Sequence, residues 1–213
     1  MGHSRADKEA THSRIVKIAA KRFRELGLDG IGVADVMKEA GMTVGGFYKH
    51  FASRDHLVVE AIAEAFKGLD VQEGRAGSVA HHLRNYLTEA HRDAPGTGCA
   101  MAALLGDIGR ASNSARAIYT ARVISNLEFY TSLLPGGDCA AKRARGLLIL
   151  SASLGALELS RALSDPALSK EVLDTVEKQL TALSVQEVEA TRSSPSNARK
   201  VRVVDTLADE HTA

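Results

Sequence analysis

The chain has 213 residues, 45% hydrophobic and 25% charged, a composition typical of a globular protein that can bury a core. Its formal net charge at pH 7 is only +1, but the charges are unevenly distributed. Residues 1–54 hold ten Lys and Arg against six Asp and Glu, whereas the remainder holds 17 against 20. A basic N-terminal part and a slightly acidic body are expected where only one part faces nucleic acid.

Cysteine usage and hydropathy argue against disulfide-rich secreted proteins and membrane proteins. Cys99 and Cys139 are the only cysteines, so the sequence has neither a disulfide framework nor a CxxC metal motif. The N-terminus is polar, without an apolar signal segment, and the longest apolar-rich run, residues 146–159, is too short for a membrane span. A cytoplasmic location is therefore expected.

The first predicted element is a helix over residues 11–26, preceded by a flexible N-terminus at residues 1–10. Gly27 ends this helix, because glycine readily adopts the positive φ found beyond a helix C-terminus. Apolar residues recur at helical spacing: they are Ile15, Ile18, Ala19, Phe23 and Leu26.

Two short helices joined by a tight turn are predicted over residues 33–51. Gly41 ends the first helix, and Thr43 is a candidate N-cap for the second. Phe47 and Phe51 lie four residues apart, so they share one face and are expected to pack inward. The polar residues between them then face outward. Such a helix, thinned by glycines at its N-terminus, is suited to a DNA groove.

A longer helix is predicted after this unit, extending to about residue 69. Ser53 is its candidate N-cap, and Asp55 lies in its first turn, where a negative charge interacts favourably with the helix dipole. Residues 11–68 are therefore predicted to form a helix-turn-helix DNA-binding domain. Three glycines mark the joint that follows: Gly68, Gly74 and Gly77.

The rest of the chain shows helical periodicity and no strand pattern, which predicts an all-α protein with a larger helical second domain over residues 69–185. Residues 186–213 are polar and are expected to be a disordered tail. The predicted body helices are 78–92, 99–110, 114–134, 138–163 and 167–183.

This arrangement resembles the tetracycline-repressor (TetR) family of bacterial regulators over residues 13–66. The resemblance implies a regulator that binds double-stranded DNA and responds to a small molecule. The matching residues are Ala19, Phe23, Gly27, Val36, Ala40, Gly41, Gly45, Phe47, Tyr48, His50, Phe51, Ser53, Arg54, Asp55 and Leu57.

The resemblance also indicates which residues contact DNA. The positions of Tyr48 and His50 would clamp backbone phosphates, and Arg54 matches a position where a lysine usually does the same. Gly45 would allow close approach of the main chain, with base reading at the two positions flanking it. Lys49 is the best candidate for a guanine edge. The whole set is Thr43, Val44, Gly45, Gly46, Tyr48, Lys49, His50 and Arg54.

One such domain reads too few base pairs for specificity, so a twofold dimer on a palindromic operator is expected. The last two body helices carry apolar stripes with small residues between them, and the resemblance favours these helices as the dimer interface. The alternative is that both stripes serve the core of a single chain.

The resemblance further implies a body cavity whose small effector releases the protein from DNA. With no Trp and few charges in this stretch, an apolar or aromatic effector is expected rather than an anionic one. The alternative for each candidate residue is that it belongs to the hydrophobic core and lines no cavity. The candidate lining residues are Met101, Leu104, Leu105, Ile108, Tyr119, Val123, Leu127, Phe129 and Tyr130.

Two other functions remain open at this point. Cys99 lies at the start of a predicted helix, where a lowered thiol pKa would suit a redox or electrophile sensor, unless it is simply a small buried residue. The second open function is a helical interaction module without a DNA role. Neither an enzyme nor a cofactor is expected, because the sequence has no GxSxG, P-loop or GxGxxG motif. His81, His82 and His91 lack the spacing of a helical metal site.

Overall fold

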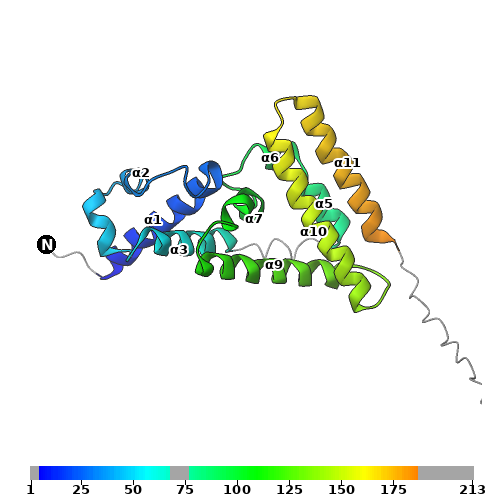
Figure 1. Cartoon of the computed structure of the whole chain (residues 1–213), viewed down its shortest axis with the longest axis horizontal. Helices are drawn as coiled ribbons and strands as arrows, with labels where there is room; N and C mark the ends of the chain where they lie inside the picture. The colour runs from blue at the N-terminus through cyan, green and yellow to red at the C-terminus, as the bar shows by residue number, and fades with distance from the viewer. Residues whose placement is uncertain (1–4, 68–76, 187–213) are drawn as a thin grey trace, which may run out of the picture.

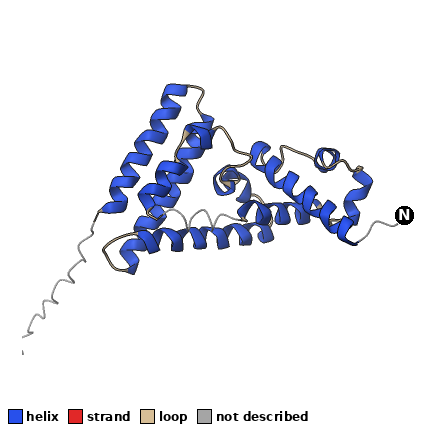
Figure 2. Cartoon of the chain, turned by 180° about the vertical axis from the view of Figure 1, so that it is seen from behind, coloured by secondary structure: helices blue, strands red, loops and turns tan. Residues whose placement is uncertain are grey.

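The computed structural model describes residues 5–67 and 77–186, and this part of the chain contains helices and no strand, as predicted (Figures 1 and 2). A group of N-terminal helices, α1 to α3, lies at one end, and the body helices form the rest. Gly68, Gly74 and the polar tail from residue 187 lie outside the described residues.

The N-terminal group consists of α1 (Arg5–Leu26), α2 (Val33–Glu39), η1 (Val44–Lys49) and α3 (Arg54–Phe66). The helix α1 begins six residues before the predicted start, so residues 5–10 are helical rather than flexible. The second helix of the predicted pair is a short 3-10 helix, consistent with the low helix propensity of its two glycines.

The turn between α2 and η1 is built as predicted at Gly41 but not at Thr43. Gly41 has a φ of +69°, and its N–H donates to Lys38 O at 3.0 Å while the N–H of Met42 donates to Met37 O at 2.9 Å. Thr43 occupies the N-cap position of η1 as predicted, but its hydroxyl makes no capping hydrogen bond, so that part of the prediction is wrong. Ser53 does cap α3, because its Oγ accepts from His56 N–H at 3.1 Å.

The body contains two breaks that the sequence did not indicate. The predicted helix 78–92 is divided at Leu87, and the predicted helix 99–110 is divided at Leu104 into two single turns. The three long helices lie within two residues of their predicted ends. The body helices are α5 (Val79–Tyr86), α6 (Glu89–Arg92), α7 (Ala100–Ala103), α8 (Leu105–Ile108), α9 (Asn113–Leu133), α10 (Cys139–Ala162) and α11 (Pro166–Val185).

The helices α10 and α11 form a hairpin at the far end from α2 and η1 (Figure 1). Asp165 caps α11 by accepting from Ala167 N–H at 2.8 Å, and Pro166 occupies the first helical position. Four leucines of this hairpin are between 43% and 52% exposed: Leu147, Leu148, Leu159 and Leu168. Within the described residues, no helix is long and apolar enough to cross a membrane.

Candidate functional site

The surface of η1 separates apolar residues from polar ones. Phe47 and Phe51 are 2% and 1% exposed and their rings stack with centroids 5.3 Å apart, so they do pack inward. Tyr48 is 78% exposed, Val44 is 52% exposed, and Lys49 also faces outward. Hence η1 presents an aromatic hydroxyl and an ammonium group on the exterior, next to a short apolar side chain.

The two glycines of η1 have opposite surroundings. A Cβ atom added at Gly45 would meet nothing within 4 Å, so this part of the main chain is open to close approach. Gly46 is buried, and a Cβ there would lie 3.7 Å from Met37 Cε. The expectation that Gly46 faces a base is therefore corrected, because its side faces the inside of the domain.

His50 is partly buried at the end of η1, where its ring lies near His12 of α1, with centroids 5.9 Å apart. Its Nδ1 atom is buried without a partner among the described residues. Burial lowers the pKa of His50, with smaller contributions from His12, Lys8 and Lys49. A nearby phosphate would favour the charged form of this ring.

His12 and Arg54 each contact two residues distant in the sequence and hold this end of the domain together. His12 Nε2 lies 2.6 Å from Glu60 Oε2, and the His12 ring stacks on Phe51 at 4.5 Å. Arg54 Nη2 donates to Leu28 O and lies 3.3 Å from a carboxylate oxygen of Asp29, while the Arg54 side chain remains 40% exposed. Arg54 therefore fastens α3 to the loop before α2 and keeps part of its guanidinium accessible.

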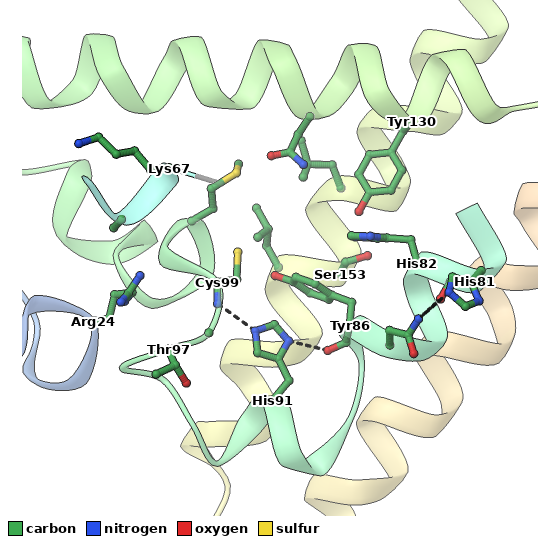
Figure 3. Close-up of a pocket in the computed structure, with 17 residues that line it drawn as sticks. Arg24, Lys67, His81, His82, Tyr86, His91, Thr97, Cys99, Tyr130 and Ser153 are labelled. Carbon is green, nitrogen blue, oxygen red and sulfur yellow. Dashed lines mark hydrogen bonds between the residues drawn. The ribbon is translucent and has the colours of Figure 1, made fainter. Parts of the chain in front are cut away.

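A cavity of about 520 Å³ lies between the N-terminal helices and the body (Figure 3). That volume is in the range of small-molecule sites. Side chains of α1, α3, α5, α9 and α10 contribute to its wall. The described lining residues are Arg24, Ala65, Lys67, His81, His82, Asn85, Tyr86, His91, Thr97, Gly98, Cys99, Met101, Asn126, Tyr130, Leu150, Ser153 and Leu154.

Of the predicted lining residues, only Met101 and Tyr130 face this cavity. Leu105 is 45% exposed, because the break at Leu104 turns the following residues away from the cavity. The other predicted residues belong to the hydrophobic core or pack against it: Leu104, Ile108, Tyr119, Val123, Leu127 and Phe129. The helix α5 instead contributes four lining residues, His81, His82, Asn85 and Tyr86, of which the sequence had drawn attention only to the two histidines.

Two histidines of the wall are held in the neutral form. His91 Nδ1 lies 2.7 Å from the Tyr86 carbonyl oxygen, and His91 Nε2 accepts from Cys99 N–H at 2.9 Å. Nδ1 must therefore carry the single ring proton, and burial lowers the pKa of His91 accordingly. Burial also lowers the pKa of His82 to about 4. The ring of His82 contacts Tyr86 and Tyr130, each with centroids 5.6 Å away.

Two buried hydrogen-bond donors of the wall have no partner among the described residues: the Tyr86 hydroxyl and Arg24 Nε. The Cys99 thiol lies between them in Figure 3. Burial and the neighbouring Cys99 raise the pKa of Tyr86 well above its usual value, so the hydroxyl keeps its proton. Unsatisfied buried donors of this kind are uncommon in proteins, and each can donate to an ordered water or to an acceptor group of a ligand.

The cavity wall is connected directly to α1. Arg24 Nη2 donates to Gly96 O at 2.5 Å, and Leu28 N–H donates to Asp107 Oδ2 at 3.0 Å. The loop that contains Gly96 lies so close to α1 that a Cβ atom added at Gly96 would be 2.2 Å from Glu25 Oε1. A change in the cavity therefore reaches the N-terminal domain through a single layer of contacts.

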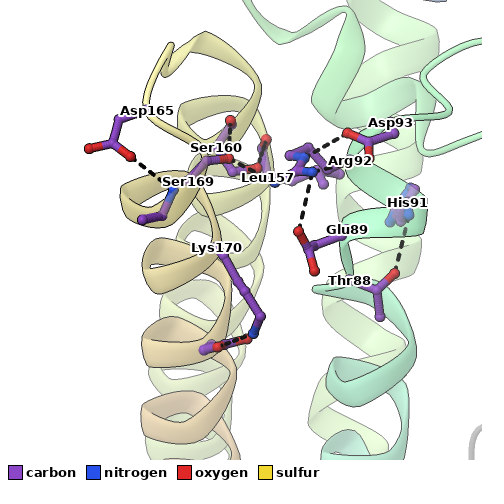
Figure 4. A network of polar contacts seen from close by, with 12 residues as sticks. Thr88, Glu89, His91, Arg92, Asp93, Leu157, Ser160, Asp165, Ser169 and Lys170 are labelled. Atoms are coloured by element: carbon purple, nitrogen blue, oxygen red, sulfur yellow. Dashed lines mark hydrogen bonds and ion pairs between the residues drawn. The ribbon is translucent and has the colours of Figure 1, made fainter.

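A polar network connects the other side of the cavity to the α10–α11 hairpin (Figure 4). Arg161 donates from Nε to Arg92 O at 2.9 Å and from Nη2 to His91 O at 3.0 Å. Arg92 Nη1 lies 3.0 Å from Ser169 Oγ, which itself donates to Ser160 O at 2.6 Å. These bonds fix α6, and with it His91, against both helices of the hairpin.

No group of three or more His, Cys, Asp or Glu side chains in the described ranges is arranged to hold a metal ion. The candidate functional features of this part of the chain are the surface of η1 and the cavity.

Comparison with known proteins agrees with this geometry. Residues 15–61 match the family model described as bacterial regulatory proteins, tetR family. No curated protein sequence matches the chain significantly.

Solved structures give the same fold over most of the chain. A TetR transcriptional regulator from Chloroflexus aurantiacus has a TM-score of 0.72 at 20% identity, over 86% of this chain and 98% of that one. The reduced form of NemR from E. coli has a TM-score of 0.66 at 14% identity, over 80% of this chain and 95% of that one. NalD, the secondary repressor of the MexAB-OprM multidrug efflux pump in Pseudomonas aeruginosa, has a TM-score of 0.57 at 18% identity, over 86% of this chain and 100% of that one.

The N-terminal domain therefore matches the tetR family of bacterial regulatory proteins over residues 15–61, and the chain has the fold of TetR-family transcriptional regulators.

Proposed function

We propose that this protein is a homodimeric transcriptional repressor that binds a palindromic operator and is released by a small molecule held in the cavity. One observation carries the proposal: the cavity that offers unsatisfied donors is walled partly by α1 and α3, and both helices also contact Phe51 just beyond η1, through the rings of His12 and His56. An occupant of the cavity thus touches the supports of the DNA-binding surface.

The proposed DNA contacts follow the exposure of η1. The Tyr48 hydroxyl, His50 and the accessible part of Arg54 bind backbone phosphates, and Lys49 reaches a base edge. The open main chain at Gly45 lets η1 lie close to the groove, with Val44 and Thr43, both exposed, beside it. Gly46 is omitted from this set because it is buried.

The proposed dimer uses the α10–α11 hairpin. Its four exposed leucines form an apolar surface that a second copy would cover, with the pairing of two hairpins giving a four-helix interface. The network around Arg161 joins this interface to the cavity, so a ligand can bias the relative position of two DNA-binding domains.

The central test is selection of bound DNA from a random pool, followed by mobility shifts at several salt concentrations. Tyr48→Phe and Lys49→Ala are expected to weaken operator binding, and Lys49→Ala is expected to relax specificity at the base pair that Lys49 contacts. Arg116→Ala is the matched control, because it removes an exposed positive charge from α9 in the body. If both η1 variants bind the operator as tightly as the wild type at the same salt concentration, the assigned contacts are contradicted. If the protein gives no salt-dependent mobility shift with any DNA, the alternative of an interaction module without a DNA role is favoured.

A second candidate is a repressor switched through Cys99. The observation in its favour is that the thiol lines the cavity, on the loop that contacts α1. The helix-dipole argument made from the sequence is not supported, because α7 is a single turn of four residues. In the proposed reaction the thiol adds to a ring carbon of a quinone: a C–S bond forms, and the thiol proton ends on a quinone oxygen.

The test treats protein with 1,4-benzoquinone and measures intact mass and DNA release. Cys99→Ser should carry one adduct fewer than the wild type and should lose the release, whereas Cys139→Ser, which removes the other, exposed thiol outside the cavity, should also carry one adduct fewer but keep the release. Release that survives in Cys99→Ser contradicts this second candidate.

A further inference from the structure

We infer that the ligand of the cavity is a small aromatic carboxylate whose anionic group is bound by Arg24 and Tyr86. The inference rests on the proposed function, since it names the class of effector for that site. It also replaces the expectation of an apolar effector, because most of the residues on which that expectation was based do not line the cavity.

The first argument for an anionic ligand comes from the hydrogen-bond donors of the cavity wall that have no partner. Arg24 Nε and the Tyr86 hydroxyl are both buried and both lack a partner among the described residues. A guanidinium N–H can only donate, so its missing partner must be an acceptor. A carboxylate has two acceptor oxygens, one for each of these donors.

The charge of the wall carries the second step. None of the described lining residues is acidic, and His82 and His91 are neutral at neutral pH for the reasons given above. Lys67 lies at the α3 end of the wall and pairs with Glu64 at 2.5 Å, so Arg24 is the principal charge facing the cavity. A cationic ligand would be repelled, and a purely apolar one would leave this guanidinium without a counter-charge.

The neighbouring acid on α1 does not neutralise Arg24 by a salt bridge. Glu25 instead pairs with Arg22 Nη1 at 2.7 Å and lies 3.9 Å from Lys21 Nζ. The one hydrogen bond found for the Arg24 guanidinium in the described structure goes to the neutral carbonyl of Gly96. Burial lowers the pKa of Arg24, and Cys99 and Glu25 act on its charge from nearby, but no salt bridge pairs this guanidinium among the described residues.

The rest of the wall selects a flat ring. Tyr86, His82 and Tyr130 present aromatic surfaces, and the rings of His82 and Tyr130 meet edge to face at 5.6 Å. Met101, Leu150 and Leu154 add apolar surface. A planar aromatic group fits against such surfaces, while its carboxylate points toward α1.

The location of Arg24 gives this class of ligand a direct effect on the DNA-binding domain. The same guanidinium that would bind the carboxylate donates to Gly96 O and belongs to α1. Binding of an anion therefore acts on the contact between α1 and the loop that contains Cys99, rather than through the length of the body.

The test measures binding of 2-naphthoate and of its uncharged analogue 2-naphthamide to the full chain by calorimetry at neutral pH, without DNA. Wild-type protein is expected to bind the carboxylate at least about tenfold more tightly than the amide. Arg24→Gln keeps a donor for Gly96 O but removes the charge, and should bring the ratio of the two dissociation constants close to one. Tyr86→Phe should weaken carboxylate binding about threefold to tenfold.

Arg84→Gln is the control, because Arg84 is an exposed arginine of α5 outside the cavity wall; it should retain the wild-type ratio. The inference is overturned if the amide binds as tightly as the carboxylate, if Arg24→Gln keeps the preference, or if both probes bind more weakly than about 1 mM. If Arg24→Gln does not fold, Tyr86→Phe decides, since it removes one hydroxyl. The proposed DNA role is tested separately. If the protein prefers the carboxylate but binds no DNA, the proposed repressor function is rejected while the inferred ligand class stands.

Discussion

Replacing His82 by Gln tests how completely the cavity wall excludes water and charge. The side chain lies among Tyr86, Phe129 and Tyr130, with ring centroids 5.4 to 5.6 Å away. Burial lowers the pKa of His82 from 6.5 to about 4. The folded protein therefore binds a proton at this site less readily than the unfolded chain does.

The sign and size of the effect follow from this difference. Between the two pKa values the unfolded state is protonated and the folded state is not, so stability is lost as the pH falls from about 6.5 toward about 4. Integrating the difference in bound protons from about pH 7 to about pH 4.5 gives a loss of roughly 2 kcal/mol from this one group. Above pH 7 the group contributes almost nothing.

The measurement is urea unfolding at a fixed protein concentration at about pH 7 and about pH 4.5, because a dimer's stability depends on concentration. The wild type should lose roughly 2 kcal/mol more than His82→Gln over this interval. His81→Gln is the control, because it changes the adjacent histidine of α5, which is exposed. Other groups titrate in all three proteins and cancel in the comparison.

Equal pH dependence in the wild type and in His82→Gln refutes the reasoning, because it shows that His82 titrates alike in folded and unfolded states. The cavity would then be hydrated enough to accept a charged imidazole. The electrostatic argument for an anionic ligand would have to count that charge as well.

Three further predictions concern the N-terminal domain and its connection to the body. Gly45→Ala should leave the melting temperature unchanged or slightly higher but weaken operator binding, whereas Gly41→Ala should lower stability by about 1 kcal/mol, since its φ is +69°. Tyr119→Phe should cost about 1–2 kcal/mol in urea unfolding, because its hydroxyl donates to the buried Met101 O at 2.7 Å. Phe51→Ala should cost about 3–5 kcal/mol, and a loss below about 1 kcal/mol would contradict the packing of η1.

Much of the N-terminal domain could be predicted because its signals are local. Gly41, Ser53 and the spacing of Phe47 and Phe51 act within a few residues, and all three predictions about them are confirmed. The contacts of His12 with Glu60 could not be predicted, since they join residues 48 positions apart. The same limit applies to the contact of Arg24 with Gly96, 72 positions apart.

By itself, the sequence determined that the protein is helical, where its long helices lie and which face of η1 is apolar, because helical periodicity and capping are short-range effects. Only the tertiary structure decided which residues surround the cavity. Two breaks, at Leu87 and Leu104, redirect the chain. Burial then sets the charge of His82 and leaves Arg24 Nε and the Tyr86 hydroxyl without hydrogen-bond partners among the described residues. Desolvation and unpaired donors arise from packing between distant segments, and this information is not contained in the local pattern of residues.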